Sequence, residues 1–263
     1  MAGRSQQELV RERFTRTAQQ FASFSLTKRS AEAERLAELA APRADCLAVD
    51  FACGPGTFTQ ALAPRVLRVC GVDLTPALLA QAQHASFEAG QKNVRFVCGD
   101  AGAVPLADDS VDLAVCGYSF HHFDSPAQVA REMARIVRRG GRVAVVDLIL
   151  PRPEHEAAHN AIERARDASH VRTHTADELG ELLVAAGLRI VAKGPGERVR
   201  EFDDWMRIAG WGPDDDAYAE TLRLLEASMP GDTAGFHPRW VESGGGQRVL
   251  EFVQTSYFLV AEK

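Results

Sequence analysis

Residues 49–58 constrain this chain more than any other stretch, because they join an apolar run to a glycine turn and a helix start. The segment reads V-D-F-A-C-G-P-G-T-F, in which Gly54 and Gly56 flank a single proline. Glycine lacks a Cβ, so it can adopt a positive φ and let the backbone approach a ligand closely. A strand followed by such a turn and a helix N-terminus predicts a nucleotide-type binding site at the carboxyl end of the strand.

Apolar, strand-like runs alternate with amphipathic helical segments through the part of the chain that follows this turn. Near-continuous apolar strands joined by helices are typical of a parallel sheet that is covered on both faces. We therefore predict a Rossmann-like, doubly wound α/β fold. The expected strands cover residues 46–51, 67–73, 94–98, 111–116 and 142–150, and the helices between them cover about residues 56–63, 75–90 and 125–140.

Further elements are expected on both sides of this alternating region. Ser5 and Glu8 form a capping-box pattern, and the helical spacing of apolar residues predicts a helical cap over residues 1–44. The simplest account of the rest is one structural domain, 45–263, with a seven-stranded, mostly parallel sheet, an antiparallel C-terminal strand and a helical insertion at about 195–246. Its later elements are expected as helices at 153–168, 175–186, 203–208 and 214–228 and strands at 188–192 and 247–262.

Charge and cysteine usage exclude several classes of protein. The formal net charge is −6 and no basic stripe is visible, so we expect no nucleic-acid partner. Residues 1–10 are polar and the chain has no apolar run of about 18 residues, so neither a secretory signal nor a membrane span is expected. The five cysteines have no C-x-x-C spacing, which predicts no disulfide framework, no metal site and a reducing, cytoplasmic location.

Acidic residues stand at the expected ends of the second and third strands. Asp73 follows the glycine turn by about 20 residues, where a carboxylate can accept both ribose hydroxyls of an adenosine-type ligand. Asp100 ends the third strand. The dinucleotide fingerprint requires a third glycine where this chain has Thr59, so the pattern disfavours a nicotinamide dinucleotide. An ordinary solvent-exposed role stays open for Asp73.

Five ordered motifs between about residues 45 and 150 resemble the class I S-adenosylmethionine-dependent methyltransferases, most closely their ubiquinone/menaquinone-biosynthesis-like branch, methyltransferase type 11. They are D-F-A-C-G-P-G-T-F, G-V-D-L-T-P-A-L-L-A-Q-A, V-R-F-V-C-G-D-A-G-A-V-P-L-A-D-D-S-V-D-L-A-V-C, H-H-F and R-I-V-R-R-G-G-R-V-A-V-V-D. A looser similarity covers residues 11–44, where F-x-x-x-A-x-x-F stands for the family's leading F-x-x-x-A-x-x-Y. Residues 166–172 are similar to a segment of a bacterial subgroup with no assigned substrate. The resemblance implies a methyltransferase that uses S-adenosylmethionine.

The resemblance also implies where that cofactor binds. Residues of the glycine turn would surround its methionyl part, Asp73 would bind the ribose, and Leu74 would pack on the adenine. Asp100 would accept from the adenine amino group, and Ala101 would offer its backbone N–H. The complete set of implied cofactor residues is Phe21, Asp50, Ala52, Cys53, Gly54, Gly56, Asp73, Leu74, Asp100, Ala101 and Cys116.

Three members of this set carry a qualified role. Phe21 stands where the family often has tyrosine, so only packing is expected of it. Ala52 replaces the usual glycine, a small change that the turn should tolerate. Cys53 is common at its position in the family, and we interpret it as a packing residue rather than a nucleophile.

Methyl transfer from a sulfonium is an in-line displacement, so the protein mainly supplies proximity, orientation and electrostatics. A general base is needed only where the acceptor loses a proton. The catalytic candidates are His121, His122 and His170, which titrate near neutral pH, together with Arg172, which would suit a carboxylate or phenolate acceptor. A structural histidine pair and a surface ion pair of Arg172 stay open as alternatives.

The expected function is transfer of a methyl group from S-adenosylmethionine to a small-molecule acceptor, on carbon, nitrogen or oxygen. Trp205, Trp211, Phe236 and Trp240 would line an aromatic acceptor pocket or, equally, fill the core of the inserted lobe. An alternative is an S-adenosylmethionine-binding protein of the same fold with a non-methylating activity or a binding role. We expect a monomer or a homodimer.

Overall fold

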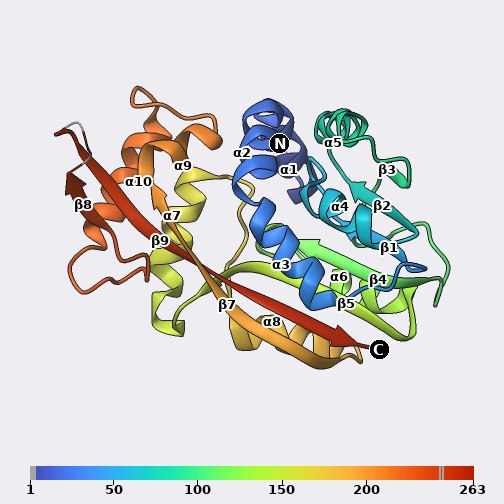
Figure 1. Ribbon diagram of the computed structural model, residues 1–263. Coiled ribbons are helices and arrows are strands. Elements are labelled where there is room, and N and C mark those ends of the chain that lie inside the picture. The colour runs from blue at the N-terminus through green and yellow to red at the C-terminus, as the bar shows by residue number, and fades with distance from the viewer. Residues whose placement is uncertain (1–3, 243, 245) are drawn as a thin grey trace.

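The computed structural model describes residues 4–242, 244 and 246–263 and has a central sheet with helices on both faces (Figure 1). Seven strands follow one path through these residues, in the order β3 (Val94–Cys98), β2 (Arg68–Asp73), β1 (Leu47–Phe51), β4 (Val111–Gly117), β5 (Val137–Leu150), β9 (Arg248–Glu262) and β7 (Arg189–Glu201). Only β9 runs antiparallel to its neighbours on this path. The predicted Rossmann-like α/β class, with its antiparallel C-terminal strand, is confirmed. Two short strands, β6 (His174–Thr175) and β8 (Arg239–Glu242), pair with β5 and β9.

Side chains of the central strands alternate between two apolar cores, one on each face of the sheet. In β4, Leu113 and Val115 belong to one core, whereas Ala114 and Cys116 belong to the other. This period of two follows from the pleat of a strand. The first core is completed by α3 (Ser30–Ala40) and α4 (Thr57–Leu62), and the second by α6 (Pro126–Ile136) and α8 (Ala176–Ala185). Because both faces are covered, the strands are apolar along most of their length.

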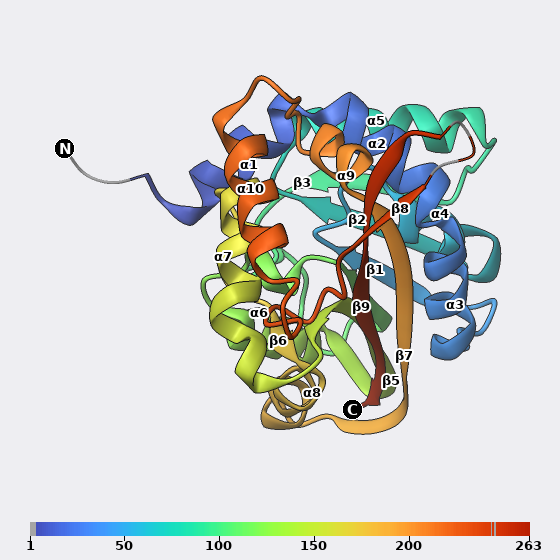
Figure 2. The same cartoon turned by 90° about the vertical axis from the view of Figure 1, so that its left-hand side faces the viewer.

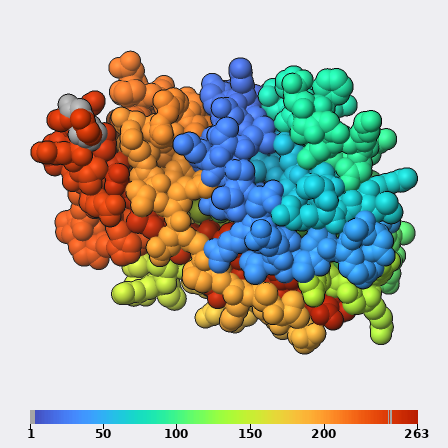
Figure 3. Space-filling model, in the orientation of Figure 1, coloured from blue at the N-terminus to red at the C-terminus, as the bar shows by residue number. Residues whose placement is uncertain are grey.

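Two helices, α1 (Gln6–Arg16) and α2 (Ala18–Lys28), precede α3 and cross the edge of the sheet. The capping box of Ser5 and Glu8 is confirmed at the start of α1. Within the helical cap predicted for residues 1–44, α1 and α2 are separated at Thr17, where φ is −114° and ψ is 18°. Figure 3 shows this N-terminal segment, in blue, filling the surface between the C-terminal lobe in orange and the region of α5 (Pro76–Glu88) and β3.

A separate lobe is formed by α7 (Glu156–Arg166), α9 (Phe202–Ile208), α10 (Asp216–Ala227), β8 and the outer halves of β7 and β9, at the left of Figure 1 and facing the viewer in Figure 2. It has its own apolar core, in which Trp205, Phe236 and Phe252 are buried. Trp240 is 38% exposed on β8. The tryptophans and Phe236 therefore mainly serve this lobe, although Trp205 also lines a cavity described below.

The sixth main strand is longer than the sequence predicts. It was expected to end at residue 192, but β7 continues to Glu201 and pairs with β9 over its whole length. Gly194, Pro195 and Gly196 disfavour a strand locally. Proline is tolerated because β7 is the edge strand of the sheet, where a missing N–H breaks no ladder. Residues 195–201, assigned to the helical insertion, are therefore part of the sheet.

The junction of α6 and β5 also differs from its prediction. The helix ends at Ile136, before the expected Gly140, and Val137 already pairs with Val111 of β4. The register then shifts, because the next paired residue of β5 is Arg142 opposite Leu113. Gly140, with a φ of 74°, lies in this irregular stretch of the strand and does not cap the helix.

The remaining local predictions agree with the structure. The capping box of Thr175 and Glu178 starts α8, and Gly90 follows α5 with a positive φ. None of the described helices combines the length and apolar character needed to cross a bilayer. Within the described ranges there are also three short 3-10 helices, η1 (Ala63–Arg65), η2 (Phe120–His122) and η3 (Pro153–His155).

Candidate functional site

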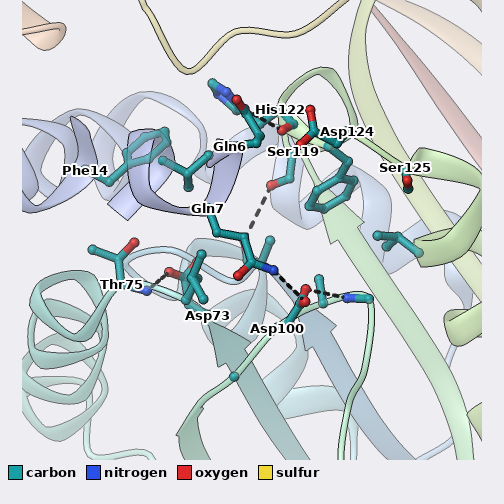
Figure 4. A pocket seen from close by; sticks show the side chains of 18 of the residues that line it. Gln6, Gln7, Phe14, Asp73, Thr75, Asp100, Ser119, His122, Asp124 and Ser125 are labelled. Atoms are coloured by element: carbon teal, nitrogen blue, oxygen red, sulfur yellow. Dashed lines mark hydrogen bonds between the residues drawn. The ribbon is translucent and has the colours of Figure 1, made fainter. Parts of the chain in front are cut away.

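A cavity of about 230 Å³ opens at the carboxyl ends of the parallel strands, where ligands bind in open α/β sheets. We call it the sheet-edge cavity. Figure 4 shows Asp73 and Asp100 on one side of it and Gln7 and Phe14 of α1 on the other. Of the predicted cofactor residues, the structure brings five to the wall of this one cavity: Ala52, Asp73, Leu74, Asp100 and Ala101.

Asp73 joins the glycine turn to the start of α5. Its Oδ2 accepts from the backbone N–H of Gly54 at 2.8 Å, and its Oδ1 accepts from the N–H of Thr75 at 2.8 Å. The residue is 8% exposed, so the solvent-exposed alternative is wrong. Burial raises the pKa of Asp73, and the two backbone hydrogen bonds oppose that rise. Each carboxylate oxygen can accept a second hydrogen bond, so Asp73 can hold the turn and a ligand hydroxyl together.

The turn between β1 and α4 holds three residues with positive φ: Ala52 at 50°, Gly54 at 54° and Gly56 at 84°. A Cβ on Gly56 would lie 3.1 Å from the Cβ of Ala82 and 3.3 Å from the ring of Phe96. Glycine is therefore needed there for both conformation and room. Ala52 adopts the left-handed region despite its Cβ, at a cost of about 1 kcal/mol. It lines the cavity, whereas the two glycines shape the turn.

Asp50 is fully buried beneath this turn. Its Oδ2 accepts from the hydroxyl of Thr59 at 2.6 Å, and its Oδ1 has no hydrogen-bond partner among the described residues. Burial raises the pKa of Asp50 to about 7, and the hydrogen bonds from Thr59 offset part of the rise. Buried polar atoms are seldom left unpaired. A ligand or water donor would satisfy this oxygen.

Asp100 is bonded to α1 across the cavity. Its Oδ2 accepts from Gln7 Nε2 at 2.8 Å, and its Oδ1 accepts from the N–H of Gly102 at 2.8 Å (Figure 4). Gln6 holds the same helix against a second part of the protein, because its Nε2 donates to the carbonyls of His122 at 2.9 Å and Ser169 at 2.6 Å. The sequence located α1 through its capping box, but it did not indicate that these two glutamines face the site.

Three further residues of the predicted set, Cys53, Cys116 and Phe21, do not line the sheet-edge cavity. Cys53 and Cys116 are buried, and burial raises the pKa of both thiols well above the ordinary value. They are therefore uncharged packing groups at neutral pH. Phe21 packs edge-on against Phe14, with ring centroids 5.0 Å apart, and lines a second cavity.

This second cavity, of about 40 Å³, has room for a small polar group. We call it the arginine-lined cavity, because Arg13, Arg29, Arg166 and Arg200 line it. It lies where α1 and α2 meet the C-terminal lobe, and its wall includes residues of α7, α9, β7 and β9. The residues that line both cavities are Phe14, Tyr118 and His122.

His121 lines the arginine-lined cavity and is held by Asp147 of β5. Its Nδ1 donates to Asp147 Oδ1 at 2.5 Å, and its backbone N–H donates to Asp147 Oδ2 at 3.2 Å. Burial alone lowers the pKa of His121, but the charge and hydrogen bond of Asp147 outweigh it, so the pKa is raised. Because Nδ1 carries the donated proton, Nε2 is the ring atom that can take up another proton.

His122 and His170 also line this cavity, so the structure brings the three candidate histidines together. The ring centroid of His121 lies 4.3 Å from that of His122 and 5.7 Å from that of His170. His122 Nδ1 donates to the carbonyl of Ser169 at 2.9 Å, and His170 Nε2 donates to Asn160 Oδ1 at 2.8 Å. Burial and the neighbouring His121 lower the pKa of His122 to about 4 and that of His170 further. Both rings are neutral at ordinary pH.

Arg172 has a different environment from the three histidines. Its guanidinium donates to Glu156 Oε1 and to Glu178 Oε1, each at 2.6 Å, and its side chain is 38% exposed. This favours the surface ion pair that was open as an alternative. The hydrogen bonds from Arg172 raise its own pKa and connect α7 to α8.

Several residues that the structure places at the two cavities were not predicted for them. Tyr118 lines both cavities and has a φ of 55°, which is rare for a residue with a large side chain. Arg29, Arg166 and Arg200 come from three separate segments, so no sequence spacing marks them as neighbours. Among residues 4–242, 244 and 246–263, no three His, Cys, Asp or Glu side chains are arranged to hold a metal ion.

Comparisons with known proteins agree on one family. A family model described as a methyltransferase domain matches residues 49–145. The uncharacterized methyltransferase YcgJ of Bacillus subtilis is 32% identical over 169 residues, which are 64% of this chain and 67% of that protein. Its crystal structure matches 89% of this chain and 98% of its own, with a TM-score of 0.79 and 27% identity.

Two further proteins are similar to this chain. The structure of a putative methyltransferase from Bacillus halodurans C-125 has a TM-score of 0.80 at 26% identity, covering 89% of this chain and 99% of that one. The demethylmenaquinone methyltransferase of Corynebacterium kroppenstedtii is 33% identical over 103 residues, which are 39% of this chain and 42% of that protein.

Proposed function

The chain belongs to the class I S-adenosylmethionine-dependent methyltransferases, and from this premise we propose that it methylates a small-molecule acceptor whose polar end is held in the arginine-lined cavity. The observation that carries the proposal is the wall common to the two cavities, formed by Phe14, Tyr118 and His122. A cofactor in one cavity and an acceptor in the other would meet at this wall. Positioning of that kind is the main contribution of a protein to a displacement reaction.

The residues of the sheet-edge cavity fit S-adenosylmethionine as a ligand. The buried Asp73 carboxylate has acceptor capacity for ribose hydroxyls beyond its two backbone bonds. Leu74 offers an apolar surface for the adenine, and Asp100 an acceptor for its amino group. Asp50 lies buried beneath the glycine turn and does not line the cavity, and we propose that its unpaired Oδ1 is joined to the cationic methionyl end through water. Bound there, S-adenosylmethionine supplies a methyl group that its sulfonium activates for displacement.

The chain's own residues would orient the acceptor and exclude water. α1 covers the sheet-edge cavity and is fastened by Gln6 and Gln7, which limits solvent access. His121 is the candidate general base, because the Asp147 carboxylate fixes its tautomer and leaves Nε2 as the proton acceptor. This role applies where the acceptor atom loses a proton on methylation. His122, which lines both cavities as a neutral ring, is proposed to position the acceptor.

We propose no direct part in the reaction for the other two catalytic candidates, His170 and Arg172. His170 is bonded to Asn160 and has a lowered pKa, so we propose that it supports the cavity wall rather than accepts a proton. Arg172 is engaged with two glutamates, and we propose a structural role for it between α7 and α8.

Calorimetry and isotope transfer test the proposal together. S-adenosylmethionine is titrated into the protein in parallel with NAD, and we expect binding of the first only. The protein is then incubated with a metabolite mixture and S-adenosylmethionine that carries a deuterated methyl group. Mass spectrometry should find a labelled product with the wild type and much less with Asp73→Ala. Preference for NAD would overturn the cofactor assignment, and cofactor binding without a labelled product would favour the non-methylating alternative.

A further inference from the structure

The arginine-lined cavity contains more arginines than carboxylates to pair with them. Arg13 is paired with Asp167, since its Nε donates to Asp167 Oδ2 at 3.0 Å. Arg166 has Glu163 at 3.8 Å, and its Nε and Nη2 donate to the carbonyl of Trp205 at 3.2 Å and 3.1 Å. Through the part of the chain that the structure describes, no carboxylate lies within 4.0 Å of the guanidinium of Arg29 or Arg200. Neither guanidinium is therefore part of an ion pair among the described residues.

Neutral groups surround both unpaired guanidinium groups. Arg29, between α2 and α3, has its Cζ 4.0 Å from the ring centroid of Tyr118. Arg200 of β7 is only 6% exposed, and its Cζ lies 4.6 Å from the ring centroid of Phe24. Its Nη1 donates to the neutral Gln254 Oε1 at 3.3 Å. The aromatic faces attract the cations, but they leave most N–H donors without an acceptor.

Each nearby carboxylate has another partner, although Oε2 of Glu32 accepts no hydrogen bond among the described residues. Glu163 accepts from Gln254 Nε2 at 3.2 Å and lies beside Arg166. Glu32, in the adjoining cleft that Arg29 and Arg200 also line, pairs with Arg198 at 2.9 Å. Asp147 is bonded to His121. Glu32 and Asp147 attract Arg29, and Glu163 attracts Arg200, but none of these carboxylates forms an ion pair with either guanidinium in the described structure.

Burying a charge without a partner is unfavourable for folding. Burial, followed by repulsion from Arg166 and Arg29, lowers the pKa of Arg200 to about 9, so the group is still protonated at neutral pH. A folded protein keeps such an arrangement most readily where a bound ligand supplies the missing charge, because functional sites often trade stability for binding. Arginine guanidinium groups match carboxylates and phosphates with paired N–H donors.

We propose that the methyl acceptor carries an oxyanion, a carboxylate or a phosphate, and that Arg29 and Arg200 bind it. This substrate class rests on the proposed function, because it assumes that the acceptor occupies the arginine-lined cavity. The cavity of about 40 Å³ has room for the oxyanion itself, and the rest of the acceptor would extend toward the sheet-edge cavity past Phe14, Tyr118 and His122. The oxyanion would be bound in the same cavity as His121, which would hold the acceptor beside the candidate base.

The proposal is tested with simple probes. The Kd values of inorganic phosphate, benzoate and the neutral analogue benzamide are measured by calorimetry at constant ionic strength, with S-adenosylhomocysteine present. We expect at least one anion to bind tenfold or more tightly than benzamide, and the comparison of phosphate with benzoate distinguishes the two oxyanions. Arg200→Gln and Arg29→Gln should each weaken that anion at least tenfold. Arg223→Gln, at an exposed pair with Glu220 on α10, should leave its Kd unchanged.

Thermal unfolding without ligand separates this role from a structural one. Removal of an unpaired buried charge should leave the Tm of Arg200→Gln unchanged or raise it, while the anion-induced rise in Tm is lost. A fall of several degrees together with unchanged anion binding would make Arg200 a structural residue and overturn the proposal. Should Arg200→Gln not fold, Arg29→Gln carries the same test.

Two outcomes separate this inference from the proposed function. Anions that bind no better than benzamide to a wild type that binds S-adenosylmethionine would overturn the substrate class and leave the methyltransferase proposal intact. A wild type that binds the anion through Arg29 and Arg200 but fails to bind S-adenosylmethionine would overturn the proposed function, and the two arginines would then form an anion site with no methyl acceptor in it. In both cases the Kd for S-adenosylmethionine is measured on the same preparations.

Discussion

The two cavities differ in charge and in how the chain builds them. The sheet-edge cavity has Asp73 and Asp100 in its wall, and most of its wall comes from strand ends that follow one another along the sequence. The arginine-lined cavity is basic, and its wall combines the N-terminal helices with elements of the C-terminal lobe. The first is a local construction that a motif can encode. The second exists only after distant segments have packed together.

Substitution of His121 should have the largest effect, and it should lower kcat without changing the affinity for S-adenosylmethionine. His121→Gln removes the candidate proton acceptor, so we expect kcat to fall by about 10²–10⁴-fold for an acceptor that loses a proton. The Kd for S-adenosylmethionine should be unchanged, because His121 lies in the other cavity. Steady-state kinetics and calorimetry provide the two readings. His84→Gln, on the exposed face of α5, is the matched control. If His121→Gln kept a kcat within twofold of the wild-type value, His121 would not be the general base.

Arg13 tests the difference between paired and unpaired arginines within one cavity. The Arg13–Asp167 pair has side chains that are only 6% and 5% exposed. Arg13→Met would leave Asp167 buried without its partner, which should lower the free energy of unfolding by about 3–5 kcal/mol. Urea denaturation measures this change. Arg4→Met at the exposed Arg4–Glu12 pair should change it by no more than about 0.5 kcal/mol. Equal effects of the two substitutions would contradict the assignment.

Asp73 tests the cofactor side of the comparison. Asp73→Ala should weaken S-adenosylmethionine binding by about 10–100-fold, or roughly 1.5–3 kcal/mol, because hydrogen bonds to a charged group are lost. Binding of an anionic probe in the arginine-lined cavity should be retained. Calorimetry with both ligands checks this, with Asp214→Ala as a control at an exposed aspartate. An unchanged affinity for S-adenosylmethionine would exclude Asp73 from the cofactor site.

The pH dependence of kcat/KM should report the His121–Asp147 pair. Protonated His121 cannot accept a proton, so activity should rise as pH increases through its raised pKa. Asp147→Asn removes the charge that raises this pKa and leaves the opposing effect of burial. The acid limb of the pH–rate profile should therefore move to lower pH. A limb at the same pH in the variant would assign the titration to another group.

Ala52→Gly should have the smallest effect. The φ of 50° at Ala52 is more favourable for glycine, but glycine also increases the entropy of the unfolded chain. These terms oppose each other, so the free energy of unfolding should rise by about 0.5 kcal/mol. Urea denaturation provides the measurement. A loss of stability greater than about 1 kcal/mol would show that the Ala52 methyl group has a packing role that outweighs its backbone strain.

The sequence predictions were accurate for features that depend on residues close together in the chain and less accurate for features that depend on distant segments. The capping box at Ser5 was predicted well, because it depends on residues three apart, and so was the start of a helix at residue 175. The end of β7 was predicted poorly, because Gly194 and Pro195 disfavour a strand locally while pairing with β9 extends it. The break at Thr17 likewise lies inside a continuous apolar stripe.

At the candidate site the same distinction holds for individual side chains. Asp73 and Asp100 could be placed at one edge of the sheet, since parallel strands bring their carboxyl ends together. The bond between Gln7 and Asp100 could not be foreseen, because it depends on how α1 lies across that edge. Arg172 was a reasonable candidate by its position, but its pairing with Glu156 and Glu178 depends on where the fold places α7 and α8.

By itself, the sequence determined the α/β class, the family and the edge of the sheet at which the cofactor is expected. A strand, a glycine turn and a helix start are set by neighbouring residues and their backbone preferences. Only the tertiary structure decided that Arg29 and Arg200 enter one cavity and that neither meets a carboxylate. Whether a charge is buried and paired depends on contacts between segments far apart in the chain, and no local preference specifies those contacts.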